Sequence, residues 1–170
     1  MKIAVIGFSG SGKSTLARRL GQLYKAEVLH LDSVHFLPGW AERDSEDEKQ
    51  IVEDFLDNHN AWVIDGNYGK LSYERRMREA DRIIMMLFGR LDCFRRVVKR
   101  FHTYKNSTRP DMADGCREKL DMEFALWVLF GGRKKAALDR LRKLRRDYPD
   151  KVVVLKNQRE LDDFCKAAGL

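Results

Sequence analysis

Residues 7–14 of this chain read Gly-Phe-Ser-Gly-Ser-Gly-Lys-Ser, which fits the pattern G-x-x-x-x-G-K-[ST] without a mismatch. Residues 2–6 before this segment are mostly apolar and β-branched, and residues 16–23 after it place leucines at helical spacing. A glycine loop between a strand and a helix lets backbone N–H groups turn inward around an anion. The segment therefore predicts a phosphate-binding loop at the first strand–helix junction of an α/β fold, rather than a flexible glycine turn.

Each part of this loop has a defined role in binding a nucleoside triphosphate. Backbone N–H groups surround the phosphate chain, the lysine reaches the β- and γ-phosphates, and the hydroxyl after it ligates Mg²⁺. We therefore expect nucleotide contacts from Gly7, Ser9, Gly10, Ser11, Gly12, Lys13, Ser14 and Thr15. Lys13 is the expected catalytic contact to the transferred phosphoryl group, and Ser14 the expected metal ligand.

The composition is compatible with one domain over residues 1–170. The net charge of +7 suits a polyanionic ligand, either a nucleotide or a nucleic acid, and does not choose between them. Cys93, Cys116 and Cys165 lack metal-ligand spacing, which favours reduced thiols and argues against zinc. No apolar run approaches the ~20 residues of a membrane span, so we expect a cytoplasmic protein without a membrane partner.

Apolar strands alternate with helical patterns, which is typical of a three-layer α/β/α domain with a parallel sheet. The strands are expected at residues 2–6, 27–31, 62–64, 82–88 and 152–155. Helices are expected from about 45, 91, 119, 133 and 158, and residues 105–117 are expected to form a mobile loop. Ser45 should cap its helix with Glu48 as capping-box partner, and Leu91 and Trp127 should face the core.

Two aspartates follow strands of the predicted sheet, where ligands of such folds bind. Asp65 is the expected second anchor for Mg²⁺, directly or through a metal-bound water, unless it is a turn aspartate before Gly66. Asp32 is expected to accept the proton of an acceptor hydroxyl near the γ-phosphate, with an Asx turn as the alternative. His35 either contacts the substrate or has a structural role.

Basic residues after the fourth strand suggest a lid over the phosphates. Arg96 and Arg100 share one helix face, which either stabilises transferred charge or is a solvated surface. Arg109, in the following loop, is a further candidate phosphate contact. The helix over residues 133–146 is also strongly basic, and it either contacts nucleic acid or is an ordinary basic surface helix without a base-reading motif.

With these residues in view, the chain resembles the adenylate-kinase-like branch of P-loop kinases, and more closely the topology modulation proteins of FlaR type. Beyond the glycine loop, the resemblance rests on residues 30–40, 62–68, 109–112 and 116–121. It implies a P-loop NTPase fold with a five-stranded parallel sheet of order 2-3-1-4-5, a lid at about residues 90–132, and ATP as donor. It also places the loop of residues 156–158, with Asn157 as the candidate contact, near the adenine, and matches Arg96 and Arg100 to lid arginines.

One departure from that branch concerns the acceptor. Adenylate kinases follow the Asp-Gly of their third strand with Pro-Arg, whose arginine binds a nucleoside monophosphate, whereas Asn67-Tyr68 stand here. Arg75, Arg76 or Arg78 could substitute, or the acceptor could be a hydroxyl compound without a phosphate.

Two functions follow from these expectations. The first is a Mg²⁺-dependent ATP phosphotransferase that acts on a small molecule, a nucleoside or a nucleotide. The second is an ATP-dependent regulatory switch that affects DNA topology, with the basic helix in contact with nucleic acid.

Overall fold

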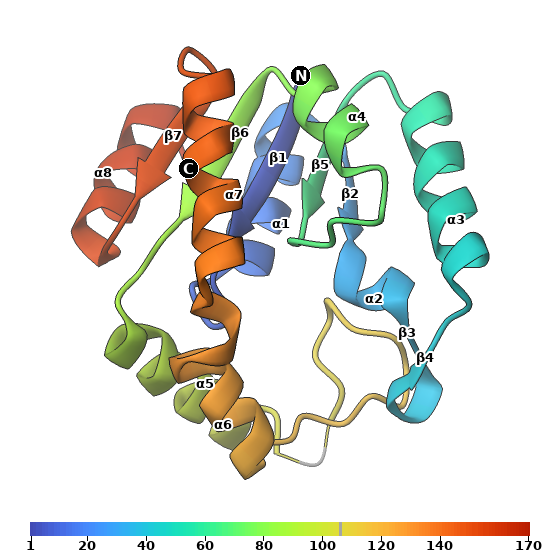
Figure 1. Cartoon of the computed structure of the whole chain (residues 1–170), viewed down its shortest axis with the longest axis vertical. Helices are drawn as coiled ribbons and strands as arrows, with labels where there is room; N and C mark the ends of the chain where they lie inside the picture. Colours follow the sequence, from blue (N-terminus) through green and yellow to red (C-terminus); the bar gives the residue numbers. More distant parts are fainter. Residues whose placement is uncertain (106) are drawn as a thin grey trace.

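The computed structural model describes residues 1–105 and 107–170. Five parallel strands form its main sheet: β1 (Lys2–Gly7), β2 (Glu27–His30), β5 (Trp62–Asp65), β6 (Arg82–Met86) and β7 (Val152–Leu155). Their spatial order is β2-β5-β1-β6-β7, which is 2-3-1-4-5 when these five strands are counted along the chain. The predicted fold class and strand order are therefore confirmed (Figure 1).

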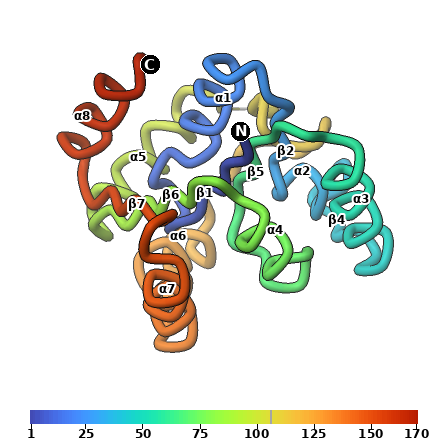
Figure 2. Tube along the Cα trace, turned by 90° about the horizontal axis from the view of Figure 1, so that it is seen from above, coloured from blue at the N-terminus to red at the C-terminus, as the bar shows by residue number. Residues whose placement is uncertain are grey.

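Helices cover both faces of the sheet, as the view from above shows (Figure 2). The elements outside the sheet are α1 (Lys13–Tyr24), α2 (Leu31–His35), β3 (Phe36–Leu37), η1 (Pro38–Trp40), β4 (Ala41–Glu42), α3 (Ser45–Asn58), α4 (Tyr73–Glu79), α5 (Arg90–Thr103), α6 (Met122–Leu129), η2 (Gly131–Arg133), α7 (Lys135–Asp147) and α8 (Gln158–Ala168). Side chains of α1, α5 and α8 pack into one buried cluster, and those of α3, α4 and α7 pack into a second. The strands lie between these two cores, which explains their nearly continuous apolar sequences.

The central strand β1 explains where ligands can bind. It pairs with β5 on one side and with β6 on the other, and all three strands run in the same direction. Their carboxyl ends therefore meet at one edge, where the β1–α1 loop, Asp65 and the start of α5 come together.

Two local predictions for the helix at residue 45 are wrong. Asp44, not Ser45, is the N-cap of α3, and its carboxylate accepts a hydrogen bond of 2.9 Å from the N–H of Glu46. The side chain of Glu48 is not a capping-box partner, because its Oε1 contacts Nδ1 of His35 at 2.9 Å. Both Asp and Ser are good caps, and the tertiary contact of Glu48 favours the earlier boundary.

Other departures concern strand ends and exposed apolar residues. The second strand ends at His30, and Asp32 lies in the first turn of the short helix α2. Leu91 is 66% exposed and Trp127 is 50% exposed, so neither is a core residue. On α5 the buried positions are Cys93 and Val97, which pack against the phosphate-loop side of the sheet.

Residues 105–121 connect α5 to α6, and apart from Asn106 this connection lies within the described chain. Asn106, a member of the predicted lid loop, lies outside the described residues. Arg109, Asp111 and Glu118 are buried, and isolated bridges pair Thr108 with Arg117 and Lys105 with Glu118. The connection thus has its own buried polar interior.

Within residues 1–105 and 107–170, no helix combines the length and the apolarity needed to cross a bilayer.

Candidate active site

A cleft of about 1260 Å³ opens at the carboxyl edge of the sheet. The β1–α1 loop, α2, α5, α6 and the connection before α6 surround it, and Figure 1 shows these elements at the same end of the molecule. From the predicted set it is lined by Ser9, Gly10, Gly12, Lys13, Ser14, Thr15, Asp32, Asp65, Arg96, Arg100 and Arg109. The fold therefore brings most of the candidate site residues to one cavity.

The glycine loop has the backbone that its sequence pattern requires. Gly10 has φ +79°, and a Cβ there would lie 2.5 Å from the backbone oxygen of Cys93. Gly7 has φ +144°, and a Cβ would lie 2.2 Å from the backbone oxygen of Met86. Side chains are thus excluded at both positions, because L-residues rarely adopt this conformation and the neighbouring backbone is too close. Ser11, also in the loop, is fully buried.

Lys13 is enclosed at the base of the cleft. Its Nζ donates a hydrogen bond of 3.1 Å to the backbone oxygen of Phe8. Burial lowers the pKa of Lys13, although the nearby carboxylates of Asp32 and Asp65 favour its charged form. A phosphate chain bound in the loop would place further negative charge beside this buried ammonium and so favour its charged form.

Ser14 and Asp65, the two predicted metal ligands, are in direct contact. Ser14 Oγ donates a hydrogen bond of 2.8 Å to Asp65 Oδ2, and His30 Nδ1 is paired with Asp65 Oδ1. Burial alone would lower the pKa of His30, but the hydrogen bond and the charge of Asp65 outweigh it and raise the pKa. His30 thus fixes one carboxylate oxygen, and the other oxygen points to the hydroxyl of the loop.

Asp32 projects into the cleft from the first turn of α2. Its side chain is 45% exposed, and its Oδ1 accepts a hydrogen bond of 2.9 Å from the hydroxyl of Tyr68. Burial and the neighbouring Asp32 carboxylate raise the pKa of Tyr68, so the phenol stays protonated and remains a donor. Nη2 of Arg109 approaches the other oxygen, Oδ2, at 3.4 Å, and the carboxylate still faces the cleft, as a proton acceptor must.

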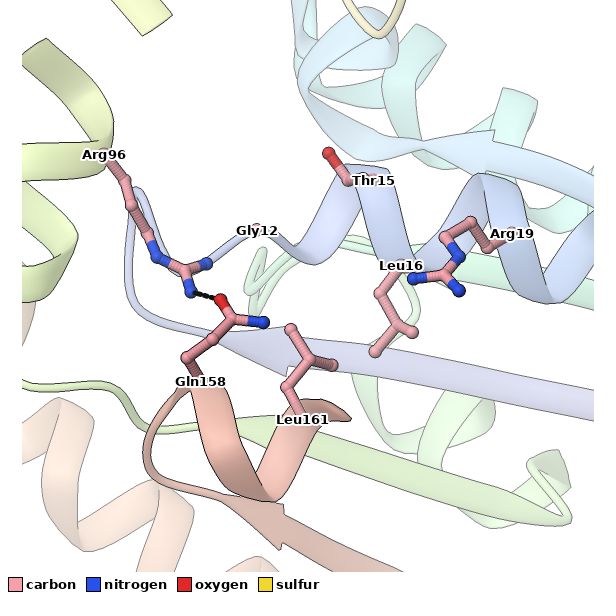
Figure 3. Close-up of a pocket in the computed structure, with 7 residues that line it drawn as sticks. All are labelled: Gly12, Thr15, Leu16, Arg19, Arg96, Gln158 and Leu161. Carbon is pink, nitrogen blue, oxygen red and sulfur yellow. Dashed lines mark hydrogen bonds between the residues drawn. The ribbon is translucent and has the colours of Figure 1, made fainter. Parts of the chain in front are cut away.

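Arg96 closes a second cavity of about 210 Å³ on the other side of the loop (Figure 3). Its Nη1 donates a hydrogen bond of 2.8 Å to the backbone oxygen of Ser11, and its Nη2 contacts Oε1 of Gln158. The guanidinium also lies over the ring of Phe88, at 4.4 Å from the centroid. Arg96 thus bridges the phosphate loop and the start of α8.

Arg100 and Arg109 lie farther along the cleft and bind carboxylates. Both Nε and Nη2 of Arg100 contact Glu118 Oε1, at 2.8 and 2.7 Å. Arg109 faces three carboxylates, with 3.4 Å to Asp32 and 3.6 Å each to Asp111 and Glu118. Burial lowers the pKa of Arg100, and the positive charge of Arg109 lowers it further.

Asn157 lies outside the lining of both cavities. Its side chain caps α8 by accepting a hydrogen bond of 2.9 Å from the N–H of Glu160. Gln158, the next residue, lines the smaller cavity instead. The adenine contact predicted for Asn157 thus stays a prediction, and its neighbour is the better-placed side chain.

The three arginines considered as substitutes for the adenylate-kinase arginine lie outside the cleft lining. Arg75 is bound by Glu53, Asp57 and Glu79, and Arg78 lies on the same helix α4, outside the cleft lining. Arg76 is fully buried, and its guanidinium donates to the backbone oxygens of residues 66, 68 and 71.

Asn67 exchanges two hydrogen bonds with the backbone of Gly7 and so ties the loop after β5 to the phosphate loop.

Arg76 is expected to be a major contributor to stability. Burial lowers its pKa to about 10, and its guanidinium is the donor to three backbone oxygens in the loop after β5. We expect Arg76→Met to lower the free energy of unfolding by about 3 kcal/mol, because buried acceptors lose their donor. Urea unfolding measures this, with the exposed Arg78→Met as control; equal stability of the two variants would contradict this role.

The basic helix α7 makes several contacts within the protein. Arg140 lies over the ring of Tyr73, and Lys143 pairs with Asp147 at 2.6 Å. Just before the helix, Arg133 donates to the backbone oxygen of Phe88. The nucleic-acid contact considered for this helix stays a prediction.

Sequence reasoning missed His30, Tyr68 and Glu118 as parts of the site. A signal for His30 was present, because residues 30 and 65 are paired in register at the ends of adjacent strands. Tyr68 follows the Asp65-Gly66 turn, whose proximity to Asp32 follows from the strand order. Glu118 lies in an irregular connection, and no periodic pattern could place it.

Known proteins similar to this chain are found by comparison of structures and not by comparison of sequences. No protein-family model and no curated protein matches the sequence. A shikimate kinase from Acinetobacter baumannii, solved with shikimate, has a TM-score of 0.58 at 16% identity and covers 98% of this chain and 89% of its own. A shikimate kinase from Bacteroides thetaiotaomicron has a TM-score of 0.51 at 14% identity, over 100% and 99%. An uncharacterized protein from Eubacterium ventriosum has a TM-score of 0.50 at 16% identity, over 99% of both chains.

At such identities the likeness concerns the fold. It extends over nearly the whole chain. The chain therefore has the three-layer α/β/α fold of the P-loop NTPases, in the form found in shikimate kinases.

Proposed function

We propose that this protein is a Mg²⁺-dependent phosphotransferase that moves the γ-phosphoryl group of ATP to a hydroxyl of a small molecule. The observation that carries the proposal is that the phosphate loop and the accessible carboxylate of Asp32 open onto the same cleft. A nucleotide-binding switch needs the loop, but it does not need an oriented base that faces the phosphates. The P-loop kinase-like fold of the chain supports the same function.

The residues of the cleft can be assigned to the steps of an in-line transfer. Asp32 would take the proton of the acceptor hydroxyl as its oxygen bonds to the γ-phosphorus, while the bond to the β-phosphate oxygen breaks and ADP leaves. Lys13 would balance negative charge on the β- and γ-phosphates, and the loop N–H groups would hold the chain in place. Tyr68 would keep Asp32 aimed at the acceptor through its hydrogen bond.

Mg²⁺ fits the donor set at Ser14 and Asp65. A hydroxyl and a carboxylate within 2.8 Å of each other suit an ion that takes further oxygens from phosphates and water. When bound, the ion would supply charge neutralisation between the β- and γ-phosphates. Asp65 would hold it through the oxygen that now faces Ser14, while His30 keeps the other oxygen in place.

The proposed lid comprises residues 90–132 of the single domain formed by residues 1–170. Arg96 already touches the phosphate loop, so it needs little movement to reach a γ-phosphate. Arg100 and Arg109 both contact Glu118, and their guanidiniums would add positive electrostatic potential at the phosphates. ATP would extend from the loop toward the cavity lined by Arg96 and Gln158, near Asn157.

His30 is expected to tune the metal site. We expect His30→Ala to raise the Mg²⁺ concentration for half-maximal activity about 10-fold, because an outer-shell partner that orients a metal ligand is lost. Magnesium titrations of the rate test this, with His59→Ala as control, because His59 contacts the backbone of Phe55 instead. An unchanged magnesium requirement in His30→Ala would contradict the proposed role of Asp65 or its support by His30.

ADP release from Mg-ATP tests the proposed function. It should be measured alone and with a panel of nucleosides, nucleoside monophosphates and small hydroxylated metabolites, with Lys13→Ala as blank. A large acceptor-dependent rise is the expected result. Slow hydrolysis that no acceptor changes would favour the regulatory switch that the resemblance to topology modulation proteins suggests, and DNA binding at several salt concentrations would follow.

A further inference from the structure

The acceptor end of the cleft lies between α2, β4 and the connection that precedes α6. Its aromatic lining is Phe36, Trp40, Tyr68 and Tyr104. Five carboxylates and three Lys or Arg side chains share this end of the lining: Asp32, Glu42, Asp111, Glu118 and Asp121 with Arg100, Arg109 and Lys119. Acidic groups are therefore in excess here, opposite to the phosphate loop with Lys13.

Arg100 and Arg109 both lie against carboxylates, and Nε of Arg109 has no hydrogen-bond partner among the described residues. Arg100 gives two N–H groups to Glu118, whose side chain is 3% exposed. Arg109, 9% exposed, faces Asp32, Asp111 and Glu118. A bound anion would have to draw these guanidiniums away from buried carboxylates, which is strongly unfavourable because it leaves buried negative charges without compensation.

Two further basic side chains at this end, Lys119 and His35, also face carboxylates. Lys119 lies over the ring of Trp40 at 5.1 Å and pairs with Asp121 at 3.7 Å. His35 sits between Glu48, at 2.9 Å, and Glu42, at 3.7 Å. Arg100, Arg109, Lys119 and His35 therefore each face at least one carboxylate, and Arg18, near His30, is a further cation of the cleft lining.

From this pairing we infer the substrate class: the acceptor is an uncharged or cationic hydroxyl compound, and the site rejects carboxylates and phosphates. The inference rests on the proposed function, because it concerns the acceptor of that transfer. Asp32 remains accessible to bind a hydroxyl or an ammonium group, and the aromatic lining can contact a ring or an alkyl chain. Specificity would thus come from carboxylates that repel the wrong substrates as much as from contacts to the right one.

Trp40 offers a binding readout that does not depend on phosphoryl transfer. Its indole N–H donates to the backbone oxygen of Arg117 at 3.0 Å, so its ¹H–¹⁵N resonance reports on this end of the cleft. The full chain, with Mg²⁺ and a non-hydrolysable ATP analogue, would be titrated with glucosamine, glucose and inorganic phosphate. Trp40→Phe assigns the resonance.

We expect glucosamine and glucose to shift the Trp40 resonance at concentrations at least about 10-fold below those that phosphate requires. In Glu118→Gln, which releases Arg100 and Arg109 from a shared partner, phosphate should bind about 10-fold more tightly than to the wild type. Glu123→Gln removes the same charge from the cleft lining at a residue outside the arginine pairs, and should leave phosphate binding unchanged. Asp111→Asn is a second variant of the same kind if Glu118→Gln does not fold.

Tighter binding of phosphate than of glucosamine by the wild type would overturn the inference, as would the absence of a shift with all three probes. Equal phosphate binding by wild type, Glu118→Gln and Asp111→Asn would also overturn it. Failure of the proposed function has a different signature, because it appears as ADP release that no acceptor stimulates.

Discussion

Replacing Lys13 by alanine is expected to lower the acceptor-dependent rate about 10²–10³-fold, because a preorganised charged donor to the transferred phosphoryl group is lost. The ammonium is enclosed by the glycine loop, where a charge interacts more strongly than in water, and its Nζ now binds the backbone oxygen of Phe8. The free protein should not lose stability, because burial already disfavours the charged form of Lys13.

Lys156→Ala is the matched control for Lys13→Ala. Lys156 is exposed, and its backbone N–H rather than its ammonium binds Glu160. Steady-state rates and thermal melting would be measured for both variants. Activity of Lys13→Ala within a few-fold of the wild type, with an intact fold, would contradict the assignment of the phosphate loop.

Asp32→Asn is expected to lower the acceptor-dependent rate about 10²–10⁴-fold, the range for loss of a general base. The amide has the same shape and can still accept the hydrogen bond from Tyr68, so the local structure should be kept. Affinity for ATP should change little, because the proposed partner of Asp32 is the acceptor hydroxyl and not the nucleotide. Single-turnover rates and calorimetric ATP titrations separate these two effects.

Tyr68→Phe provides the comparison for Asp32→Asn. It removes the hydrogen bond to Oδ1 but leaves the carboxylate, so its rate should fall much less than that of Asp32→Asn. Full activity of Asp32→Asn would contradict the role of this residue as base. Loss of ATP binding in Asp32→Asn would instead place the residue with the nucleotide.

The global fold could be predicted because its signals are strong and local. The glycine loop, five short apolar segments and the helices between them are visible in the sequence, and the resemblance implied the strand order that the structure has. Where two local choices are nearly equal, packing decided. Asp44 and Ser45 are both good helix caps, but the side chain of Glu48 contacts His35 and is not the capping-box partner that was predicted for Ser45. The observed N-cap is Asp44.

Trp127 shows a different limit of the sequence pattern. Its spacing with neighbouring apolar residues is that of a buried helix face, but α6 lines a cleft and leaves Trp127 half exposed. Helical periodicity identifies an apolar face, and it does not say whether that face covers a core or a ligand site.

The candidate site was predictable where a motif or a strand end defines it, as for Lys13, Ser14 and Asp65. It was not predictable where the partners come from irregular chain. Arg109 stays a predicted phosphate contact, but no sequence pattern indicated the three carboxylates around it. Arg76 looked like a possible acceptor contact, but it is buried and holds the loop after β5. Such pairings depend on tertiary contacts between segments far apart in the sequence.

Phosphoryl transfer to a hydroxyl compound can be followed through the γ-phosphoryl group itself. ATP labelled in that group would be incubated with Mg²⁺, the protein and uncharged or cationic hydroxyl compounds, and the products would be separated. Phosphoryl transfer with Asp32 as base should place the label in an organic phosphate ester, formed by the wild type and lost in Asp32→Asn. Label found entirely in inorganic phosphate, at a rate that no acceptor changes, would contradict it.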